Sequence, residues 1–270
     1  FEVNKALISR SMVFHLQPLT VENIYTILKH ALVASVAIFS LQSCDNDDND
    51  YDYSLLFPNA LVTVKTDAND TFFLQLDDKT TLLPVNVTKS PFGEKEVRAL
   101  VNYDETTDPA EGFSKSVHIN WIDSILTKPI AQRFEDEEEN DNVYGTDPVE
   151  ILNSWMTVSE DGYLTLRFST AWGNTGTKHF VNLVPTNNPE NKYELEFRHN
   201  AYGDVNGHLA DGLVAFKLDQ LPDTNGETVK LKLIWNSFSG EKSYEFDYCT
   251  RQSTPANPDM TSVRAKNFIN

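Results

Sequence analysis

Short runs in which apolar and polar residues alternate dominate this chain from Leu55 onward. Such runs, bounded by Asp, Asn, Gly and Pro, are the pattern of β-strands that bury one face. The 270 residues include 16 Phe, 10 Tyr and 4 Trp, which is enough large apolar surface for real cores. We therefore predict an all-β protein.

Five of the predicted strands fall within residues 55–130, a span that suits a small barrel. They cover residues 60–65, 71–76, 81–87, 96–103 and 115–126. Closing these strands into a barrel would remove the exposed sheet edges that otherwise invite aggregation. We predict an OB-type β-barrel domain over 55–130.

An acidic run, Glu135–Asp141, follows this first group of strands. Blocks of like charge are typical of solvated loops, and the spacing of these carboxylates matches no calcium loop. We therefore interpret 131–142 as an acidic linker between two domains. A short helix is predicted over Pro148–Ser154, because proline favours the first turn of a helix.

Residues 143–252 contain about seven further strands separated by frequent turns. Asp161-Gly162, Asn225-Gly226 and Ser239-Gly240 are typical of tight turns between strands. This density of strands and turns predicts an antiparallel β-sandwich over 143–252, followed by a loose tail over 253–270.

The stretch Ala31–Cys44 predicts location rather than fold. Its apolar part, 31–41, has 11 residues, too few to cross a bilayer but suited to the core of a signal peptide. Its end, Leu41-Gln42-Ser43-Cys44, resembles a bacterial lipobox, which implies cleavage before Cys44 and acyl chains on its sulfur. We predict a lipoprotein signal peptide with an upstream extension over 1–43, with Met12 as a candidate start. The alternative is a buried helix with an incidental cysteine.

Residues 44–54 form a predicted acidic tether, with four aspartates between Asp45 and Asp50. This cluster resembles the export signal that sends some lipoproteins of Gram-negative bacteria to the outer face of the outer membrane. A solvated spacer explains the same composition. The formal net charge of −18 opposes binding to nucleic acid and to anionic lipid.

Several segments together resemble the NigD-like family of bacterial lipoproteins. The segments that carry the resemblance are Trp121–Pro129, Tyr144–Val149, Asp161–Phe168, Leu195–Asn200 and Phe246–Cys249. The resemblance implies an N-terminal OB-type domain, a C-terminal β-sandwich and an association with bacteriocin loci. It supplies no catalytic residues.

The motifs of common catalytic sites are absent from this sequence. It has no His-Glu-x-x-His, Cys-x-x-Cys, phosphate-binding loop or Gly-x-Ser-x-Gly elbow, and we expect no cofactor. His199, Asp204, His208 and Asp211 are weak metal candidates, because two imidazoles and two carboxylates within 13 residues can bind zinc. A polar loop between strands explains the same residues.

Aromatic side chains in loops are the best candidates for ligand contact. Trp172, beside a Gly- and Thr-rich loop, suits a binding platform or the core equally, and Tyr202 is the next candidate. Trp121, Trp155 and Trp235 are predicted to be core residues.

Two further positions carry weaker signals. Cys249 is predicted to be an unreactive, structural thiol. Asp123-Ser124-Ile125 resembles a bacterial O-glycosylation site, although a buried strand serine explains Ser124 as well.

Together these features predict a non-catalytic lipoprotein, anchored through Cys44 on the surface of a Gram-negative outer membrane. Its expected partner is a protein or a glycan. The alternatives are a carboxylate-based glycan-active enzyme, whose two carboxylates would flank a sugar bond, and a periplasmic immunity factor associated with a bacteriocin.

Overall fold

The computed structural model describes residues 53–110, 112–173 and 175–251. The predicted signal peptide, the predicted lipid-attachment residue Cys44 and the predicted tail over 253–270 lie outside these residues. A 3₁₀ turn, η1, covers Tyr53–Leu56. Within the described part of the chain, no helix is long and apolar enough to pass through a lipid bilayer.

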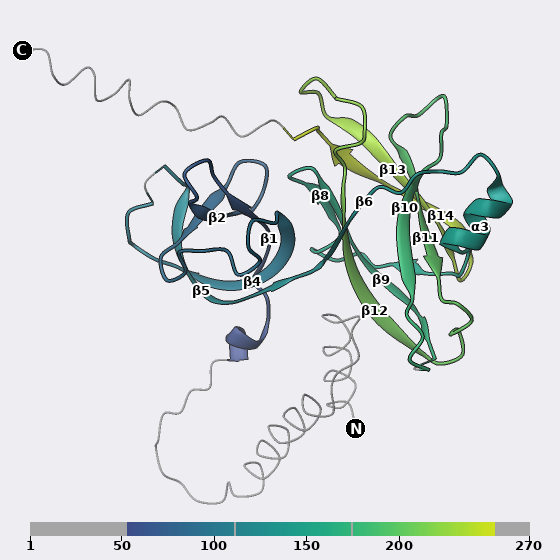
Figure 1. The fold of residues 1–270 in the computed structure, drawn as a ribbon, viewed down its shortest axis with the longest axis horizontal. Helices are drawn as coiled ribbons and strands as arrows, with labels where there is room; N and C mark the ends of the chain where they lie inside the picture. The colour runs from purple at the N-terminus through teal and green to yellow at the C-terminus, as the bar shows by residue number, and fades with distance from the viewer. Residues whose placement is uncertain (1–52, 111, 174, 252–270) are drawn as a thin grey trace, which may run out of the picture. The chain divides into compact units, whose positions relative to one another are not determined.

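The first five strands form a closed barrel, as the alternating runs predict (Figure 1). They are β1 (Ala60–Thr66), β2 (Phe72–Gln75), β3 (Thr81–Pro84), β4 (Val97–Glu105) and β5 (Lys115–Ser124). They pair in the order β1-β2-β3-β5-β4, with β3 parallel to β5. The inward-facing residues of every strand, such as Val62, Leu74, Leu82, Val101 and Val117, make one buried cluster.

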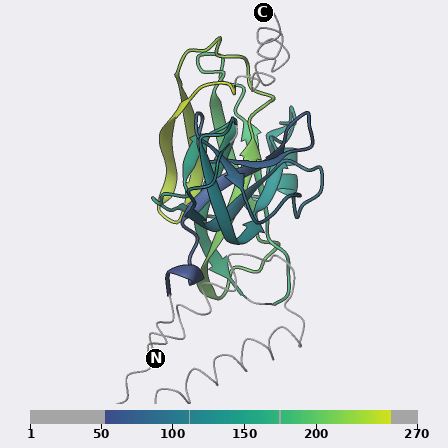
Figure 2. The same ribbon diagram turned by 90° about the vertical axis from the view of Figure 1, so that its left-hand side faces the viewer.

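The remaining strands form a β-sandwich of two layers, visible from two directions in Figures 1 and 2. One sheet has the order β10-β11-β13-β14 and the other has the order β6-β12-β9-β7, with β8 also paired to β9. The bounds are β6 Leu126–Pro129, β7 Glu150–Ile151, β8 Val158–Glu160, β9 Tyr163–Trp172, β10 Phe180–Pro185, β11 Glu194–Asn200, β12 His208–Lys217, β13 Val229–Ser237 and β14 Gly240–Tyr248.

The core of the sandwich lies between the two sheets and uses the faces that alternation predicts. Leu164, Leu166 and Phe168 of β9 meet Leu195 and Phe197 of β11 in one buried cluster. The tight turn at Asp161-Gly162 is confirmed, because both residues have positive φ angles, of 48° and 73°, and β8 pairs with β9 across it.

The sandwich is less regular than a series of antiparallel hairpins. β11 pairs with β13 in parallel, and β6 pairs with β12 in parallel. The Asn225-Gly226 turn therefore leads from one sheet to the other rather than joining two paired strands. β6, which the sequence places at the end of the barrel's fifth strand, belongs to the sandwich.

A helix, α3 (Glu137–Tyr144), replaces most of the predicted acidic loop. The Asp136 side chain accepts a hydrogen bond from the Glu138 N–H and caps the helix. Three glutamates in the first turn stabilise the helix further, because their negative charges lie near the positive N-terminal end of the helix dipole. Arg198 of β11 forms ion pairs with Glu137 and Asp141, so these acidic residues face a cation rather than solvent alone. The helix lies outside β10 and β11 (Figure 1).

Two other local predictions are wrong. Pro148–Ser154 contains the short strand β7 rather than a helix. Trp155 is 54% exposed and is not a core residue, whereas Trp235 is buried in the sandwich core. Trp155 follows β7 in a turn, where strand alternation no longer decides which side chains are buried.

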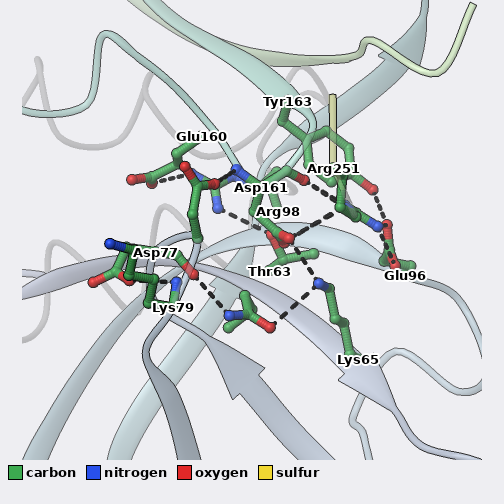
Figure 3. Close-up of polar contacts among 12 residues, drawn as sticks. Thr63, Lys65, Asp77, Lys79, Glu96, Arg98, Glu160, Asp161, Tyr163 and Arg251 are labelled. Atoms are coloured by element: carbon green, nitrogen blue, oxygen red, sulfur yellow. Dashed lines mark hydrogen bonds and ion pairs between the residues drawn. The ribbon is translucent and has the colours of Figure 1, made fainter. Parts of the chain in front are cut away.

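The barrel and the sandwich meet through a group of buried and half-buried charges, which we call the seam (Figure 3). Asp161, at the β8–β9 turn, accepts a hydrogen bond of 2.8 Å from Lys65 Nζ of β1. Its backbone N–H donates to Asp78 Oδ1 of the barrel at 2.7 Å, and its carbonyl oxygen accepts from Arg251 at 2.5 Å. Lys65 is 8% exposed and Asp161 is 4% exposed, so both charges depend on protein partners.

A second set of contacts completes the seam. Arg98 of β4, fully buried, donates to Thr63 Oγ1 and forms an ion pair of 2.6 Å with Glu160. The Tyr163 hydroxyl donates to Glu96 Oε1 at 2.5 Å, and Arg251 donates to both oxygens of the same carboxylate. Burial lowers the pKa of Lys65, although the neighbouring Asp161 opposes this effect.

We predict that Asp161→Asn destabilises the protein by about 2–4 kcal/mol, because it leaves the buried Lys65 without its counter-charge. Asparagine tolerates the left-handed backbone, so the effect isolates the lost charge. Chemical denaturation measures the difference. Lys230→Met, which removes an exposed ion pair with Asp247, is the matched control and should change stability by less than about 1 kcal/mol. Equal effects of the two substitutions would contradict a stabilising seam.

Candidate ligand-binding end of the sandwich

A cluster of buried polar side chains lies next to the hydrophobic core, at one end of the sandwich. Trp172 is the last residue of β9, His179 directly precedes β10, and His199 lies in β11. Asp204 comes from the loop after β11. His179, His199 and Asp204 are 6%, 1% and 3% exposed. We call these four residues the polar cap.

His179 connects the members of the polar cap. Its Nδ1 lies 2.9 Å from His199 Nε2, and its Nε2 lies 3.3 Å from Asp204 Oδ2. The Trp172 indole stacks on the His179 ring, with centroids 4.0 Å apart and planes 8° from parallel. A Cβ atom on Gly173 would lie 2.1 Å from Asp204 Oδ1, so only glycine allows β9 to end this close to the carboxylate.

Charges in the polar cap are set by burial and by these contacts. Burial, followed by the neighbouring His179, lowers the pKa of His199 to about 4. Burial disfavours the Asp204 carboxylate, but hydrogen bonds from Thr175 and His179 hold its pKa below the ordinary value. His199 is therefore neutral and Asp204 ionised at neutral pH, and one proton lies between the two imidazoles.

The weak metal candidates do not come together as a set. His199 and Asp204 both contact His179, whereas His208 is exposed at the start of β12 and Asp211 forms an ion pair of 2.5 Å with Arg167. Among the described residues, no group of three or more His, Cys, Asp or Glu side chains is arranged to hold a metal ion. The residue that sequence reasoning missed is His179, which directly precedes β10 and belongs to no motif.

Next to the polar cap, two aromatic side chains stand exposed on the surface. Phe180 of β10 is 48% exposed and Tyr202 is 58% exposed, and their rings meet edge to face with centroids 5.6 Å apart. We call them the aromatic pair. Trp172, by contrast, is half-buried and occupied by its stack on His179. Ligand contact through Trp172 and Tyr202 stays a prediction.

Tyr202 is held in an uncommon backbone conformation. Its φ angle is 49°, in the left-handed region that bulky side chains avoid, and Gly203 follows with a φ of 82°. The Asp204 N–H closes the turn onto the Ala201 carbonyl oxygen at 3.0 Å. A residue held in this region costs on the order of 1 kcal/mol or more. The turn therefore presents a tyrosine where glycine or asparagine would fold more easily.

A hollow of about 250 Å³ lies on the side of the four-stranded sheet that carries α3. It is lined by residues 145–147, by Glu196, Arg198 and Ile234, and by Asn236 and Glu241. Arg198 forms ion pairs with Glu196, Glu137 and Asp141. The one arginine in the lining is therefore already paired with carboxylates of the protein itself.

Comparison with known proteins gives the family. Residues 61–125 match the family model of the NigD-like N-terminal OB domain, and residues 132–248 match that of the NigD-like C-terminal beta sandwich domain. This chain belongs to the NigD-like family. The resemblance drawn from the sequence is thereby confirmed. The match from residue 132 also includes α3, which agrees with its packing on the sandwich.

Solved structures of similar proteins support the same fold. A crystal structure from Parabacteroides distasonis, described as a "Putative TOXIN related protein", is 38% identical, with a TM-score of 0.59, and the match covers 78% of this chain and 98% of that one. A protein of unknown function from Bacteroides vulgatus is 27% identical, with a TM-score of 0.58 and coverages of 73% and 92%. A NigD-like immunity protein from Bacteroides caccae is 19% identical, with a TM-score of 0.51 and coverages of 70% and 96%. No curated protein matches this chain.

We predict that the polar cap makes this NigD-like protein less stable in acid. His199 has a pKa of about 4 when folded and an ordinary value near 6.5 when unfolded. The stability that its neutral form contributes is therefore complete above about pH 6.5 and is lost as the pH falls towards 4. Between pH 7.5 and pH 5 the loss is roughly 2 kcal/mol.

Chemical denaturation at these two pH values measures the loss. His199→Gln, which cannot titrate, should show a pH dependence smaller by about the same amount. The same slope in both proteins would mean that the polar cap does not control acid sensitivity.

Proposed function

We propose that this NigD-like protein is a non-catalytic binding module that contacts a protein or glycan partner through the aromatic pair. We further propose that lipid on Cys44 anchors it to the outer membrane of a Gram-negative bacterium, facing outward. The observation that carries the binding proposal is Tyr202, an exposed aromatic residue kept in a left-handed conformation.

Strained and exposed residues often mark functional positions, because a strain of this kind persists only where the surrounding structure holds it. The base of the turn is firm: Asn200 Oδ1 accepts from the Tyr202 N–H at 3.0 Å, and Asp147 Oδ2 accepts from the Ala201 N–H at 2.7 Å. Asp204, two residues on, belongs to the polar cap. Tyr202 is therefore presented by a rigid turn, which reduces the entropy lost on binding.

The chemistry of the aromatic pair suits a partner that offers apolar surface and a few polar groups. Tyrosine supplies a large rigid contact area with one hydroxyl and is enriched in binding interfaces. The C–H face of a sugar ring and the apolar side chains of a protein both meet this description. The tests below distinguish the two.

We predict that Tyr202→Asn raises stability by about 0.5–1 kcal/mol and abolishes ligand binding, because asparagine adopts the left-handed conformation more easily but offers no ring. Thermal unfolding measures the first effect. Binding is measured on an array of animal and plant glycans and on a panel of purified surface proteins, with wild type as reference.

Two matched controls accompany this substitution. Tyr244→Asn changes an equally exposed tyrosine, 58% exposed, that lies in a regular strand, so it should bring no gain in stability. Trp155→Ser removes another exposed aromatic ring and should leave ligand binding unchanged. A Tyr202→Asn protein that binds every ligand like wild type would refute the role of the aromatic pair.

The location is tested separately, with full-length chain expressed in a Gram-negative host. We predict that Cys44→Ala releases the protein from the membrane fraction, since stable anchoring needs the acyl chains. Protease added to intact cells should digest the wild-type protein while a periplasmic marker stays intact. A protected protein would contradict the outward orientation and would favour the alternative of an immunity factor in the periplasm. The similar Bacteroides caccae protein is described as a NigD-like immunity protein.

A further inference from the structure

The last strand of the four-stranded sheet leaves one edge open. β14 pairs with β13 along its whole length, and no strand in the described part of the chain pairs with its other side. Residues 240–245 are exposed, whereas Phe246 and Tyr248 are buried. β8 also lies near β14, and Arg251, shortly after the end of β14, bonds Asp161, directly after the end of β8, so the two strands approach each other at their C-terminal ends. The first six residues of β14 therefore form a free edge.

The hydrogen bonds of β13 fix which backbone groups point outward from this edge. The Lys232 N–H donates to Tyr193, and the Asn236 carbonyl accepts from Val149, both on the side away from β14. Because such groups alternate along a strand, the odd-numbered residues of β13 bond β14. Their partners in register, such as Lys242 and Tyr244, have even numbers. The N–H and C=O groups of residues 241, 243 and 245 therefore point away from the sheet.

The side chains along this edge define a chemistry. Glu241 and Glu245 lie on one face of β14, four residues apart with Ser243 between them. Among the described residues neither forms an ion pair: Lys232 of β13, opposite Glu245 in register, attracts both carboxylates but forms its ion pair with Glu194. Their neighbours differ: Lys242 pairs with Glu150, and Asp247 pairs with Lys230.

The opposite face of the same edge is aromatic. Tyr244 is 58% exposed and touches Phe246 edge to face, with centroids 4.9 Å apart. The free edge thus offers unpaired backbone groups, two carboxylates on one face and a tyrosine ring on the other.

We propose that the free edge of β14 binds an extended segment of another protein as an added antiparallel strand. The segment carries basic residues four apart, opposite Glu241 and Glu245, and an apolar residue opposite Tyr244. Backbone hydrogen bonds supply the general affinity, and the side chains supply selectivity. The chain's net charge of −18 favours the approach of a basic segment.

A second copy of this chain does not fit the same edge. Antiparallel self-pairing centred on Ser243 would set Glu241 against Glu245 twice, with like charges directly opposite each other. Charge complementarity therefore selects a basic partner over a homodimer.

The test uses a labelled peptide, SGKVTVKGS, whose two lysines lie four apart. In register, they face Glu245 and Glu241, the first valine faces Tyr244, and the threonine faces Ser243. Binding is followed by fluorescence anisotropy, and amide hydrogen exchange is followed by NMR. The expected result is saturable binding and slowed exchange at the amides of Glu241, Ser243 and Glu245. The amides of Lys242 and Tyr244, already bonded to β13, should change little.

Ser243→Pro is the decisive variant, because its lost N–H points outward and the pairing with β13 is kept. It should weaken binding at least tenfold. Glu241→Lys with Glu245→Lys should also weaken binding about tenfold, whereas Glu190→Lys, an exposed acid in the β10–β11 loop, is the matched control without effect.

The peptide SGKVPVKGS repeats the test without altering the protein, since its central proline lacks the N–H that would bond Ser243. It should bind at least tenfold more weakly than SGKVTVKGS. Absence of binding by wild type up to about 1 mM peptide, or equal binding by Ser243→Pro or by the proline peptide, would overturn the proposal.

Discussion

The arrangement of the two domains depends on one buried carboxylate, that of Asp161. Asp161 belongs to a tight turn in which both it and Gly162 have positive φ angles. The backbone geometry of this turn therefore decides where the carboxylate lies. Lys65 reaches it from the barrel and Arg251 from beyond the last strand. Burying three charges costs free energy unless each finds its partner, so the seam tolerates little change in the position of the turn. A tight turn in the sandwich thereby fixes the position of the barrel.

Local sequence patterns predicted most of the strands of this fold. The order in which the strands pair depends on contacts between residues far apart in the sequence. Alternation located the barrel strands and the core faces of β9, β11 and β13, because which residues are buried in a strand is a local property. The acidic helix α3 was not predicted, although its N-cap Asp136 and its first-turn glutamates are local signals, because a block of like charge was interpreted as a solvated loop. The cation that this block faces, Arg198, lies more than fifty residues later in the sequence. The parallel pairing of β11 with β13 could not be predicted either, because the sequence of one strand does not determine which other strand it pairs with.

The same division applies to the candidate site. Tyr202 could be singled out as a loop aromatic, but its left-handed φ angle could not, because the letters Tyr-Gly do not require it. His199 and Asp204 were noticed for their residue types, while His179, which joins them, lies twenty residues before His199, directly ahead of β10, and belongs to no motif. The polar cap exists because the ends of three strands converge, and this convergence is a property of the sandwich as a whole.

Arg251 is the last residue of the seam to be synthesised. It binds Glu96, 155 positions earlier in the sequence, and both backbone and side chain of Asp161. The barrel strands all lie between residues 60 and 124, and they pair only with one another, so closing the barrel requires no strand of the sandwich. The contacts that Arg251 makes with Glu96 and Asp161 can form only after β14 has been synthesised. If the barrel closes during synthesis, Arg251 can join it to the sandwich only after the chain has been made through residue 251.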